Sequence, residues 1–251
     1  MKRMRTILRG QKAIIYNVAF SPNGRSLLSP SDYKSVRIWN IRDGSSRILP
    51  VTGSTGSFMS VVFSPDGRYA AAGNNDDSLW IWELRTLRLV AKWRGHRYSV
   101  WSVVFTADGK GLMSGHYDKV VKYWDVSLLG NRRGVSTGLV VHEDDGFPLV
   151  QSFLGHSVRF VLLSSHNADW GTFLTQDCVR SIALFPNNTQ CLVTSSDDTS
   201  VRVWDIESGV CQLTLKGHTN WVRGVDLSRT QNFLATAGED RRVMVWKYAL
   251  L

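Results

Sequence analysis

The sequence predicts an all-β fold of five repeated four-stranded sheets, arranged as the blades of a β-propeller. One observation is a recurring distance: His96 precedes Trp124 by 28 residues, and His218 precedes Trp246 by the same distance. Another is that tryptophans recur at steps of 42 or 43 residues, with one step of 80, at Trp39, Trp82, Trp124, Trp204 and Trp246. The third is hydrophobic alternation bounded by Asn-Gly or Asp-Gly pairs, which is typical of β-hairpins because glycine accepts the positive φ of such turns.

Each repeat has the same order of elements. An alternating apolar run is followed by a turn, a strand of small residues, a turn that contains Asp, and a second alternating run that ends in Trp. The first runs of three repeats are residues 14–20, 58–63 and 100–105, each followed by a turn that contains Gly. We expect a single domain, residues 1–251, whose repeats span approximately residues 10–52, 53–94, 95–154, 155–216 and 217–251.

Two repeats are degraded at the first position but keep the distance to the tryptophan, which lies 28 residues after Gln11 in one and 28 after Ser54 in the other. The dipeptide Trp-Asp is intact at residues 124–125 and 204–205, and Asn, Glu or Lys follows the other three tryptophans. By these residues the chain resembles WD-repeat proteins over nearly its whole length.

The resemblance implies a buried hydrogen-bond relay in each complete repeat, in which an indole N–H, a hydroxyl, an imidazole and a carboxylate are joined and pin the strands together. Three repeats contain all four groups: His96, Ser114, Asp118 and Trp124; His156, Thr194, Asp198 and Trp204; and His218, Thr236, Asp240 and Trp246. In the two degraded repeats, Ser29 keeps the hydroxyl position and Asp76 keeps the carboxylate position. Each bond contributes about 0.5–1.5 kcal/mol to stability.

Hydroxyl, His and Asp side chains together also suggest a hydrolase. Their repetition argues against catalysis, because an enzyme needs one activated nucleophile beside a substrate pocket, whereas these groups recur where the fold buries them between strands. The sequence also contains no glycine-rich phosphate loop and no metal-ligand cluster. We therefore expect no enzymatic activity, no cofactor, no metal and no small-molecule substrate.

Composition sets further limits. The formal net charge of +9 favours acidic peptides as partners through electrostatic steering, but no basic stripe or groove-entering helix predicts sequence-specific nucleic-acid binding. Cys178, Cys191 and Cys211 have neither disulfide nor zinc spacing. No run is apolar and long enough to span a bilayer, and the start of the chain lacks a secretory signal. These features predict a soluble protein of the nucleus or cytoplasm that does not bind membranes.

Two segments interrupt the repeats. Residues 127–149 lack periodicity and predict an exposed loop, and its acidic stretch, residues 142–145, is interpreted as solvated rather than as a metal site. Residues 158–176 fit no strand, and their removal shortens the distance between His156 and Trp204 from 48 to 29 residues. Our hypothesis is that this block is an unremoved, in-frame intron. A genuine surface loop and a functional lid are the alternatives.

Closure of the propeller has two solutions. Residues 4–8 resemble an outer strand, and the chain ends on the third strand of its last repeat, so the two ends are complementary. Five repeats form either a closed five-bladed ring or an incomplete arc of a seven-bladed propeller. An open arc would expose apolar sheet faces and strand edges.

Within WD-repeat proteins, the chain resembles the C-terminal propeller of fungal Tup-type, Groucho-related transcriptional corepressors. Residues 99–109, 121–125 and 245–248 carry this resemblance. It implies the last five of seven blades, without the first two blades and the N-terminal oligomerising region of that family. It also implies a scaffold that docks transcription regulators on its narrow face, where the loops entering the first strands and the Asp-bearing turns converge.

The partner-binding residues predicted on the narrow face follow the first apolar position of each first strand or flank it. They are Tyr16, Met59, Tyr98, Trp101, Tyr117, Arg180, Trp221 and Arg223. Tyr, Trp and Arg are the residue types that dominate interface hot spots. Two alternatives stay open: several of these side chains are half-buried packing residues, or the chain is a WD-repeat adaptor or substrate receptor that reads acidic or phosphorylated peptides with Arg180 and Arg223.

Overall fold

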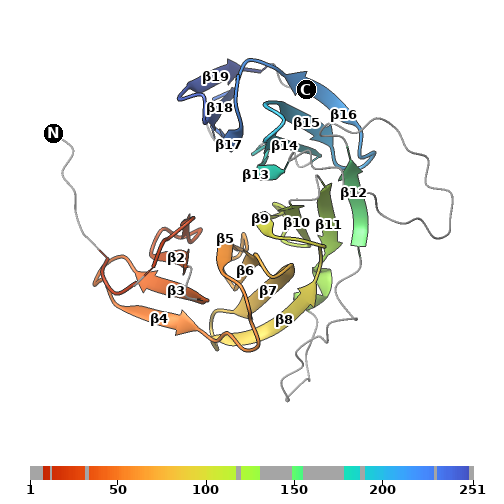
Figure 1. Ribbon diagram of the computed structural model, residues 1–251. Coiled ribbons are helices and arrows are strands. Elements are labelled where there is room, and N and C mark those ends of the chain that lie inside the picture. The colour runs from red at the N-terminus through yellow and green to blue at the C-terminus, as the bar shows by residue number, and fades with distance from the viewer. Residues whose placement is uncertain are drawn as a thin grey trace.

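A computed structural model of the chain confirms the all-β prediction and shows five antiparallel sheets side by side (Figure 1). The structure describes residues 8–11, 13–31, 34–116, 120–130, 149–154, 178–186, 190–228 and 231–248. Within each sheet the strands are neighbours in the order in which they follow one another along the chain. Each sheet is therefore built locally from successive hairpins, as the repeated pattern predicts.

The strands and the single 3-10 turn of the described residues have the following bounds. The first sheet contains β1 (Ala19–Phe20), β2 (Ser26–Ser31), β3 (Ser35–Asn40) and β4 (Ser46–Leu49), and the second contains β5 (Phe58–Phe63), β6 (Tyr69–Asn74), β7 (Ser78–Glu83) and β8 (Arg88–Arg94). The third contains β9 (Val100–Phe105), β10 (Gly111–His116), β11 (Val120–Asp125) and β12 (Leu149–Leu154), with η1 (Ser127–Gly130) after β11. The fourth contains β13 (Val179–Leu184), β14 (Cys191–Ser196), β15 (Val201–Asp205) and β16 (Cys211–Leu215), and the fifth contains β17 (Val222–Leu227), β18 (Phe233–Gly238) and β19 (Val243–Lys247).

Four of the sheets have the four predicted strands, whereas the fifth has three strands within the described residues. Its last strand, β19, contains Trp246 and is the third strand of its sheet, as predicted. The outer strand expected at residues 4–8 lies outside the described residues except for Leu8, which belongs to no strand.

The loop expected at residues 127–149 begins as η1, and β12 starts at Leu149, the last residue of the predicted loop. Because β12 pairs with β11, this insert separates the third and fourth strands of the third sheet. Residues 131–148, with the acidic stretch 142–145, and residues 155–177, with the block 158–176, lie outside the described residues.

The hydrophobic core lies between successive sheets. In the second to fifth sheets, the tryptophan near the end of the third strand packs against the preceding sheet. Trp82 lies with Leu28 and Leu49 of the first sheet, and Trp124 lies with Leu79 of the second. Burying one such indole removes on the order of 150–250 Å² from water, which makes these residues large contributors to the interfaces between sheets. The recurring tryptophan is thus the residue that joins one repeat to the next.

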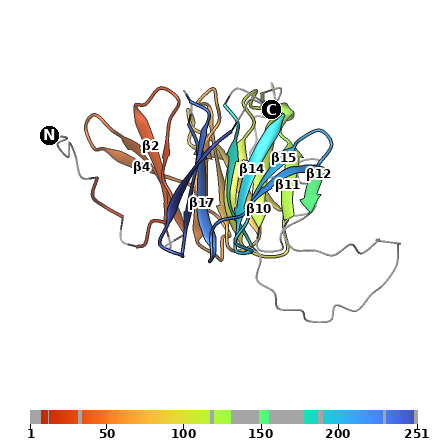
Figure 2. The ribbon, with the colours of Figure 1, turned by 90° about the horizontal axis from the view of Figure 1, so that it is seen from above.

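The sheets follow one another along an arc, with the first and fifth sheets at its two ends (Figure 1). Both end sheets carry exposed apolar side chains: Phe20 is 67% exposed in the first, and Val243 and Val245 are 74% and 66% exposed in the fifth. Figure 2 views the arc edge-on and shows strands running from one face to the other, so that the turns gather on two opposite faces. The starts of β5, β9, β13 and β17 and the turns after β6, β14 and β18 share one of these faces, which is the predicted narrow face.

Candidate functional site

A β-bulge begins the first strand of the second, third, fourth and fifth sheets. In β5, the register passes from Phe58 to Ser60 and leaves one residue without a partner on β6, and the same shift occurs in the other three strands. The extra residues are Met59, Trp101, Arg180 and Arg223. A bulge re-aims a side chain away from the regular alternation of a strand. Four of the eight predicted partner-binding residues are therefore bulge residues. The sequence pattern predicted their positions but not the bulges.

Arginine and tryptophan side chains of three successive sheets stack on the narrow face. The Arg180 guanidinium lies 4.5 Å from the centre of the Trp101 ring and 5.7 Å from that of Trp221. The Arg223 guanidinium also contacts Trp221, at 4.9 Å from the centre of its ring. We call Trp101, Arg180, Trp221 and Arg223 the narrow-face ladder. Cation–π contacts of this kind hold planar groups face to face and are worth about 0.5–2 kcal/mol each, depending on exposure.

Two carboxylates pair with the arginines of the ladder. Asp197 accepts hydrogen bonds from Arg180 Nε at 2.8 Å and from its terminal nitrogen at 2.6 Å, and the side chains are only 9% exposed for Arg180 and 1% for Asp197. Glu239 accepts from Arg223 Nε at 2.8 Å, but there both side chains are about 40% exposed. The two pairs therefore differ in kind: the first is a buried, bidentate ion pair, and the second lies at the surface.

Sequence reasoning missed Asp197 and Glu239. Each directly precedes the relay aspartate of its repeat, and its backbone N–H donates to a carbonyl just before the first strand, from Asp197 to Cys178 at 3.1 Å and from Glu239 to Trp221 at 2.8 Å. This bond brings the turn beside the bulge. A signal was present, because an acidic residue stands in this place in the two repeats whose bulge residue is arginine.

Tyr98 lies on the same face and is 59% exposed. Its ring stacks on His116 at a centroid distance of 5.9 Å, and His116 in turn stacks on His96 at 4.3 Å. The Tyr98 backbone N–H donates to His116 Nε2 at 2.6 Å. An exposed aromatic ring is thus supported from below by two imidazoles, the deeper of which belongs to the relay.

Three predicted partner-binding residues lie apart from the ladder. Met59 is only 6% exposed, which agrees with the alternative of a packing residue: an apolar thioether at a bulge gains free energy by packing inward. Tyr16 is 45% exposed but precedes the first sheet, away from the fourth and fifth sheets that carry the two arginines. Tyr117 lies outside the described residues.

The relay is present in full in the last repeat. Trp246 Nε1 donates to Thr236 Oγ1 at 3.0 Å, the Thr236 hydroxyl lies 2.8 Å from His218 Nε2, and His218 Nδ1 lies 2.8 Å from an Asp240 carboxylate oxygen. Because Nδ1 faces a carboxylate, it carries the proton, so Nε2 accepts from the threonine. One direction of donation runs from the indole through the hydroxyl and the imidazole to the carboxylate.

The predicted relays of the third and fourth repeats are present as far as the described residues extend. In the third repeat, Ser114 Oγ accepts from Trp124 Nε1 at 2.8 Å and lies 2.6 Å from His96 Nε2, while Asp118 is outside the described residues. In the fourth repeat, Trp204 Nε1 donates to Thr194 Oγ1 at 2.9 Å, while His156 is outside the described residues. Asp198 accepts hydrogen bonds from the Ser200 hydroxyl at 2.6 Å and from Arg202 at 3.3 Å.

The degraded repeats build related bonds from different residues. In the first, Gln11 replaces the imidazole: Ser29 Oγ donates to its side-chain oxygen at 2.6 Å and accepts from Trp39 Nε1 at 2.7 Å. In the second, Ala72 of β6 occupies the hydroxyl position, and a similar set of hydrogen bonds forms at the start of β7. There Trp80 Nε1 donates to Ser78 Oγ at 2.6 Å, and Ser78 donates to Asp76. The recurring tryptophan of this repeat, Trp82, donates from Nε1 to the Pro50 carbonyl at 2.7 Å instead of to a hydroxyl. Both indoles therefore have an acceptor, and the cost of leaving a buried donor unpaired is avoided.

The relay groups are unsuited to nucleophilic catalysis. Ser114 and Thr194 are fully buried and Thr236 is 1% exposed, and each hydroxyl oxygen already accepts from an indole. Burial raises the pKa of the Cys178 thiol to about 12, so this cysteine is no nucleophile either. Within the described residues there is no group of three or more His, Cys, Asp or Glu side chains suited to a metal ion. No helix of the described segments has the length and apolar character needed to cross a bilayer.

Burial depresses the pKa of His96 well below its ordinary value, with His116 and Lys122 adding positive charge nearby. The unfolded chain therefore takes up this proton more readily, so the contribution of His96 to stability is constant above about pH 6.5 and falls as the pH drops below that value. The variant His96→Gln copies Gln11 of the first repeat. Between pH 6.5 and pH 5, we expect it to lose up to about 2 kcal/mol less stability than the wild type. Urea unfolding of both proteins across this range measures the difference. Parallel stability curves would contradict a buried, neutral His96.

The family model described as WD domain, G-beta repeat, matches residues 2–40, 46–83, 87–125, 171–205 and 209–247. The chain belongs to the WD40 family. Each matched segment of this WD-repeat protein ends one residue after the tryptophan of a third strand, and the fourth begins only at residue 171, leaving His156 outside. The predicted WD-repeat resemblance is confirmed, whereas the finer resemblance to Tup-type corepressors stays a prediction.

The chain is also similar, over part of its length, to several known proteins. The chain is 32% identical over 102 residues to the Nuclear distribution protein PAC1 of Arthroderma otae, covering 39% of this chain and 18% of that protein. It is 38% identical over 74 residues to the DDB1- and CUL4-associated factor 10 of Xenopus tropicalis, covering 28% and 15%. It is 46% identical over 55 residues to the Nuclear distribution protein PAC1-2 of Uncinocarpus reesii, covering 22% and 12%. The chain thus spans less than a fifth of the length of each of these relatives.

Proposed function

We propose that this WD-repeat protein is a non-catalytic scaffold that docks another protein on its narrow face. The observation that carries the proposal is the narrow-face ladder, which joins three sheets, together with the exposed ring of Tyr98 near its third-sheet end. Aromatic and arginine side chains held rigid before binding lose little entropy on complex formation, which is why they dominate interface energetics.

The ladder supports docking rather than mere packing because it combines rigidity with exposure. Trp221 is half-buried between two guanidiniums, so its ring is fixed, while Arg223 beside it is 40% exposed on its side chain. Burying such a ring under a partner gains apolar contact without ordering a mobile side chain. The family is built of repeats whose faces carry binding loops, which agrees with this placement.

For the partner, we infer a transcription regulator bound in the manner of the corepressors that residues 99–109, 121–125 and 245–248 resemble. This partner class would place the protein in the nucleus, or in the cytoplasm before import. The geometry supports it in one respect: the Arg180 charge is balanced by buried Asp197, so the centre of the ladder favours aromatic and apolar side chains of a partner over strongly acidic ones.

A second candidate is an adaptor or substrate receptor that reads acidic or phosphorylated peptides. Two observations favour it: the similarity to a DDB1- and CUL4-associated factor, and the exposed pair of Arg223 and Glu239. An exposed ion pair contributes only about 0–1 kcal/mol, so a phosphate or carboxylate of a ligand can displace Glu239 at little cost. In this alternative, the reading residue is Arg223 rather than the buried Arg180.

The double variant Tyr98→Ala, Trp221→Ala is expected to weaken capture of the partner at least about tenfold without unfolding the protein, because two hot-spot side chains are removed. The partner is first isolated with the tagged full chain and then titrated against both proteins. Leu213→Ala is the matched control, because Leu213 is 43% exposed on the outer strand β16, away from the narrow face.

Two assays separate the candidates. A corepressor-type scaffold, tethered to a reporter promoter, should lower transcription, and the double variant should not. A substrate receptor should instead co-purify with DDB1, and its Arg223→Gln variant should no longer bind an acidic peptide. Equal partner binding by the wild type and by the double variant would show that docking does not occur on the ladder.

A further inference from the structure

The positive charge of the protein is concentrated at its first repeat. Residues 1–50 contain ten Lys or Arg and two Asp, and the remaining residues contain 20 Lys or Arg and 19 Asp or Glu. Eight of the nine net positive charges therefore belong to the first fifth of the chain. Among the described residues of this segment, Asp43 is the single acidic side chain.

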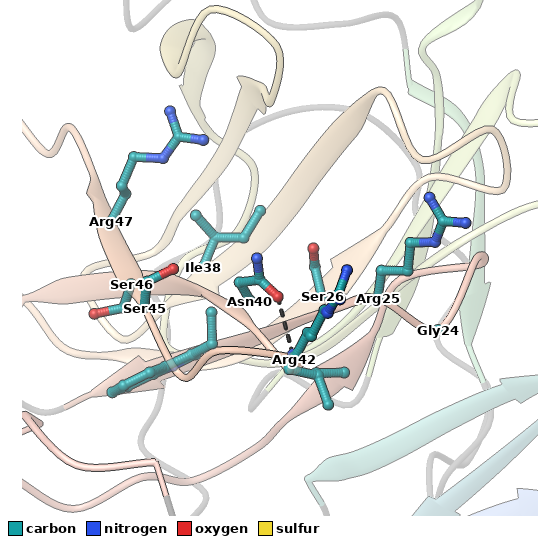
Figure 3. Close-up of a pocket in the computed structure, with 11 residues that line it drawn as sticks. Gly24, Arg25, Ser26, Ile38, Asn40, Arg42, Ser45, Ser46 and Arg47 are labelled. Atoms are coloured by element: carbon teal, nitrogen blue, oxygen red, sulfur yellow. Dashed lines mark hydrogen bonds between the residues drawn. The ribbon is translucent and has the colours of Figure 1, made fainter.

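Part of this charge surrounds a pocket of about 880 Å³ on the first sheet (Figure 3). Arg25 follows the β1–β2 turn, and Arg42 and Arg47 flank the β3–β4 turn. Figure 3 shows the Arg25 and Arg47 side chains at two sides of the pocket, with Ser26 and Asn40 between them. Because successive strands are antiparallel, these turns lie on the face opposite the narrow face and its ladder. We call this site the first-sheet basic pocket.

The pocket lacks a carboxylate that the same turn carries in the next two sheets. In the second and third sheets the β5–β6 and β9–β10 turns contain Asp66 and Asp108, each of which accepts from a hydroxyl at position two before it and from a backbone N–H two residues after it. In the first sheet Asn23 makes the same two bonds, from Ser21 Oγ at 2.8 Å and from the Arg25 N–H at 3.0 Å. The turn is conserved in geometry, but its negative charge is absent.

The second acidic position is altered in the same way. The residue after the third-strand tryptophan is Glu83, Asp125 or Asp205 in the second, third and fourth sheets, but it is Asn40 in the first. The Asn40 side-chain oxygen accepts from the Arg42 N–H at 2.9 Å, just as the Asp125 carboxylate accepts from the Ser127 N–H at the same distance. Two amides thus replace two carboxylates beside a cluster of arginines.

The three arginines of the pocket are available to a ligand. Arg25, Arg42 and Arg47 are exposed, and no other described residue forms a hydrogen bond or ion pair with any of their guanidiniums. Asp43, the neighbouring acid, already accepts from Asn40 Nδ2 at 3.0 Å and from the Ser45 N–H at 2.8 Å. Three arginines with one neighbouring carboxylate, Asp43, leave a net positive charge that destabilises the fold slightly. An anion bound in the pocket would neutralise this charge.

We propose that the first-sheet basic pocket binds the phosphate group of a phosphorylated segment of a partner protein. Guanidinium groups form paired, charge-assisted hydrogen bonds with phosphate oxygens, and the hydroxyls of Ser26, Ser45 and Ser46 supply further donors around the same space. The lining offers no exposed aromatic ring on which a base could stack, because Trp39 is 3% exposed. A phosphopeptide therefore fits the pocket better than a single-stranded nucleic acid does.

The test measures binding of a labelled phosphoserine peptide, with flanking acidic residues, to the full chain. We expect binding that inorganic phosphate competes away, that weakens with salt, and that the unphosphorylated peptide of the same sequence does not show. Short single-stranded and duplex DNA are titrated in parallel. DNA binding tighter than phosphopeptide binding would overturn the proposal, and so would the absence of phosphate-dependent binding.

The decisive variant is Asn23→Asp with Asn40→Asp. Each change is nearly isosteric and keeps the accepting oxygen of its turn, while two carboxylates enter the pocket. Asn40→Asp also removes the hydrogen bond from Asn40 Nδ2 to Asp43, so urea unfolding of the variant is measured beside binding. We expect the affinity for the phosphopeptide to fall at least about tenfold. Replacement of Arg25, Arg42 and Arg47 by Gln should have at least the same effect.

The matched control replaces Arg68, Arg85 and Arg88 by Gln, because these residues are also exposed, belong to the second repeat, and change the net charge by the same amount. This variant should retain binding within about twofold. If it weakens binding as much as the first-sheet variant does, the interaction follows the overall charge and the pocket has no role. Tyr98→Ala with Trp221→Ala should leave phosphopeptide binding unchanged, so failure of this proposal and failure of narrow-face docking give different results.

Discussion

Replacement of Asp197 by alanine is expected to lower the free energy of unfolding by about 3–5 kcal/mol, because it removes the carboxylate that pairs with the buried guanidinium of Arg180. The pair is bidentate, with distances of 2.8 and 2.6 Å, and the exposed fractions of the side chains are 9% and 1%. Chemical unfolding of the variant and of the wild type, followed by tryptophan fluorescence, measures this difference.

Two further variants make the result specific. Glu239→Ala removes the exposed partner of Arg223, whose side chain is 40% exposed, and it should cost only about 0–1 kcal/mol. Arg180→Met with Asp197→Leu removes both charges at once, and it should recover most of the stability lost in the single variant because no charge is left buried. If Asp197→Ala and Glu239→Ala cost the same, the distinction between a buried and a surface pair is wrong.

The same pair decides how the narrow face is read. The guanidinium of Arg180 is held by Asp197 and covered by the rings of Trp101 and Trp221, so it acts as a spacer between two indoles. In the sequence, Arg180 and Arg223 stand at equivalent positions and are predicted to play the same role. The structure separates them, because the residues that pair with them differ in burial.

The periodic part of the structure could be predicted from the sequence because each repeat is local. The distance from His218 to Trp246 fixes which strands are neighbours, and the relay follows from residue types at fixed offsets. The turn glycines Gly24, Gly67 and Gly109 have φ values of 67°, 70° and 71°, so their places could be read directly from the hairpin signal. The number of sheets and their strand order follow from these facts.

The remaining features depend on contacts between residues whose separation carries no pattern. The rebuilt series through Trp80 and Ser78 arises because Ala72 offers no hydroxyl, and alternation alone cannot reveal which polar group replaces it. The bulges that aim Trp101 and Arg180 are one-residue register shifts, which leave the hydrophobic pattern almost unchanged. The burial of Met59, which is 6% exposed, likewise cannot be derived from its position in the repeat, because the equivalent residues Trp101 and Arg223 are more exposed.

Thr236→Val is expected to lower the free energy of unfolding by about 2–5 kcal/mol, because it orphans two buried groups while keeping the shape of the side chain. Thr236 is 1% exposed, and its hydroxyl both accepts from Trp246 Nε1 and donates to His218 Nε2. Valine can do neither. Thr214→Val in β16 is the matched control, and it should change stability by less than about 0.5 kcal/mol because Thr214 is exposed.

Thr236→Ser separates the lost hydroxyl from the altered packing, because serine keeps the hydroxyl and loses one methyl group at a cost of about 1 kcal/mol. A valine variant as stable as the serine variant would contradict the relay as a source of stability. The effect should also be local. Since the fifth sheet packs against the fourth on one side and exposes Val243 and Val245 on the other, loss of its relay should raise amide exchange in β17–β19 before it does so in β5–β8.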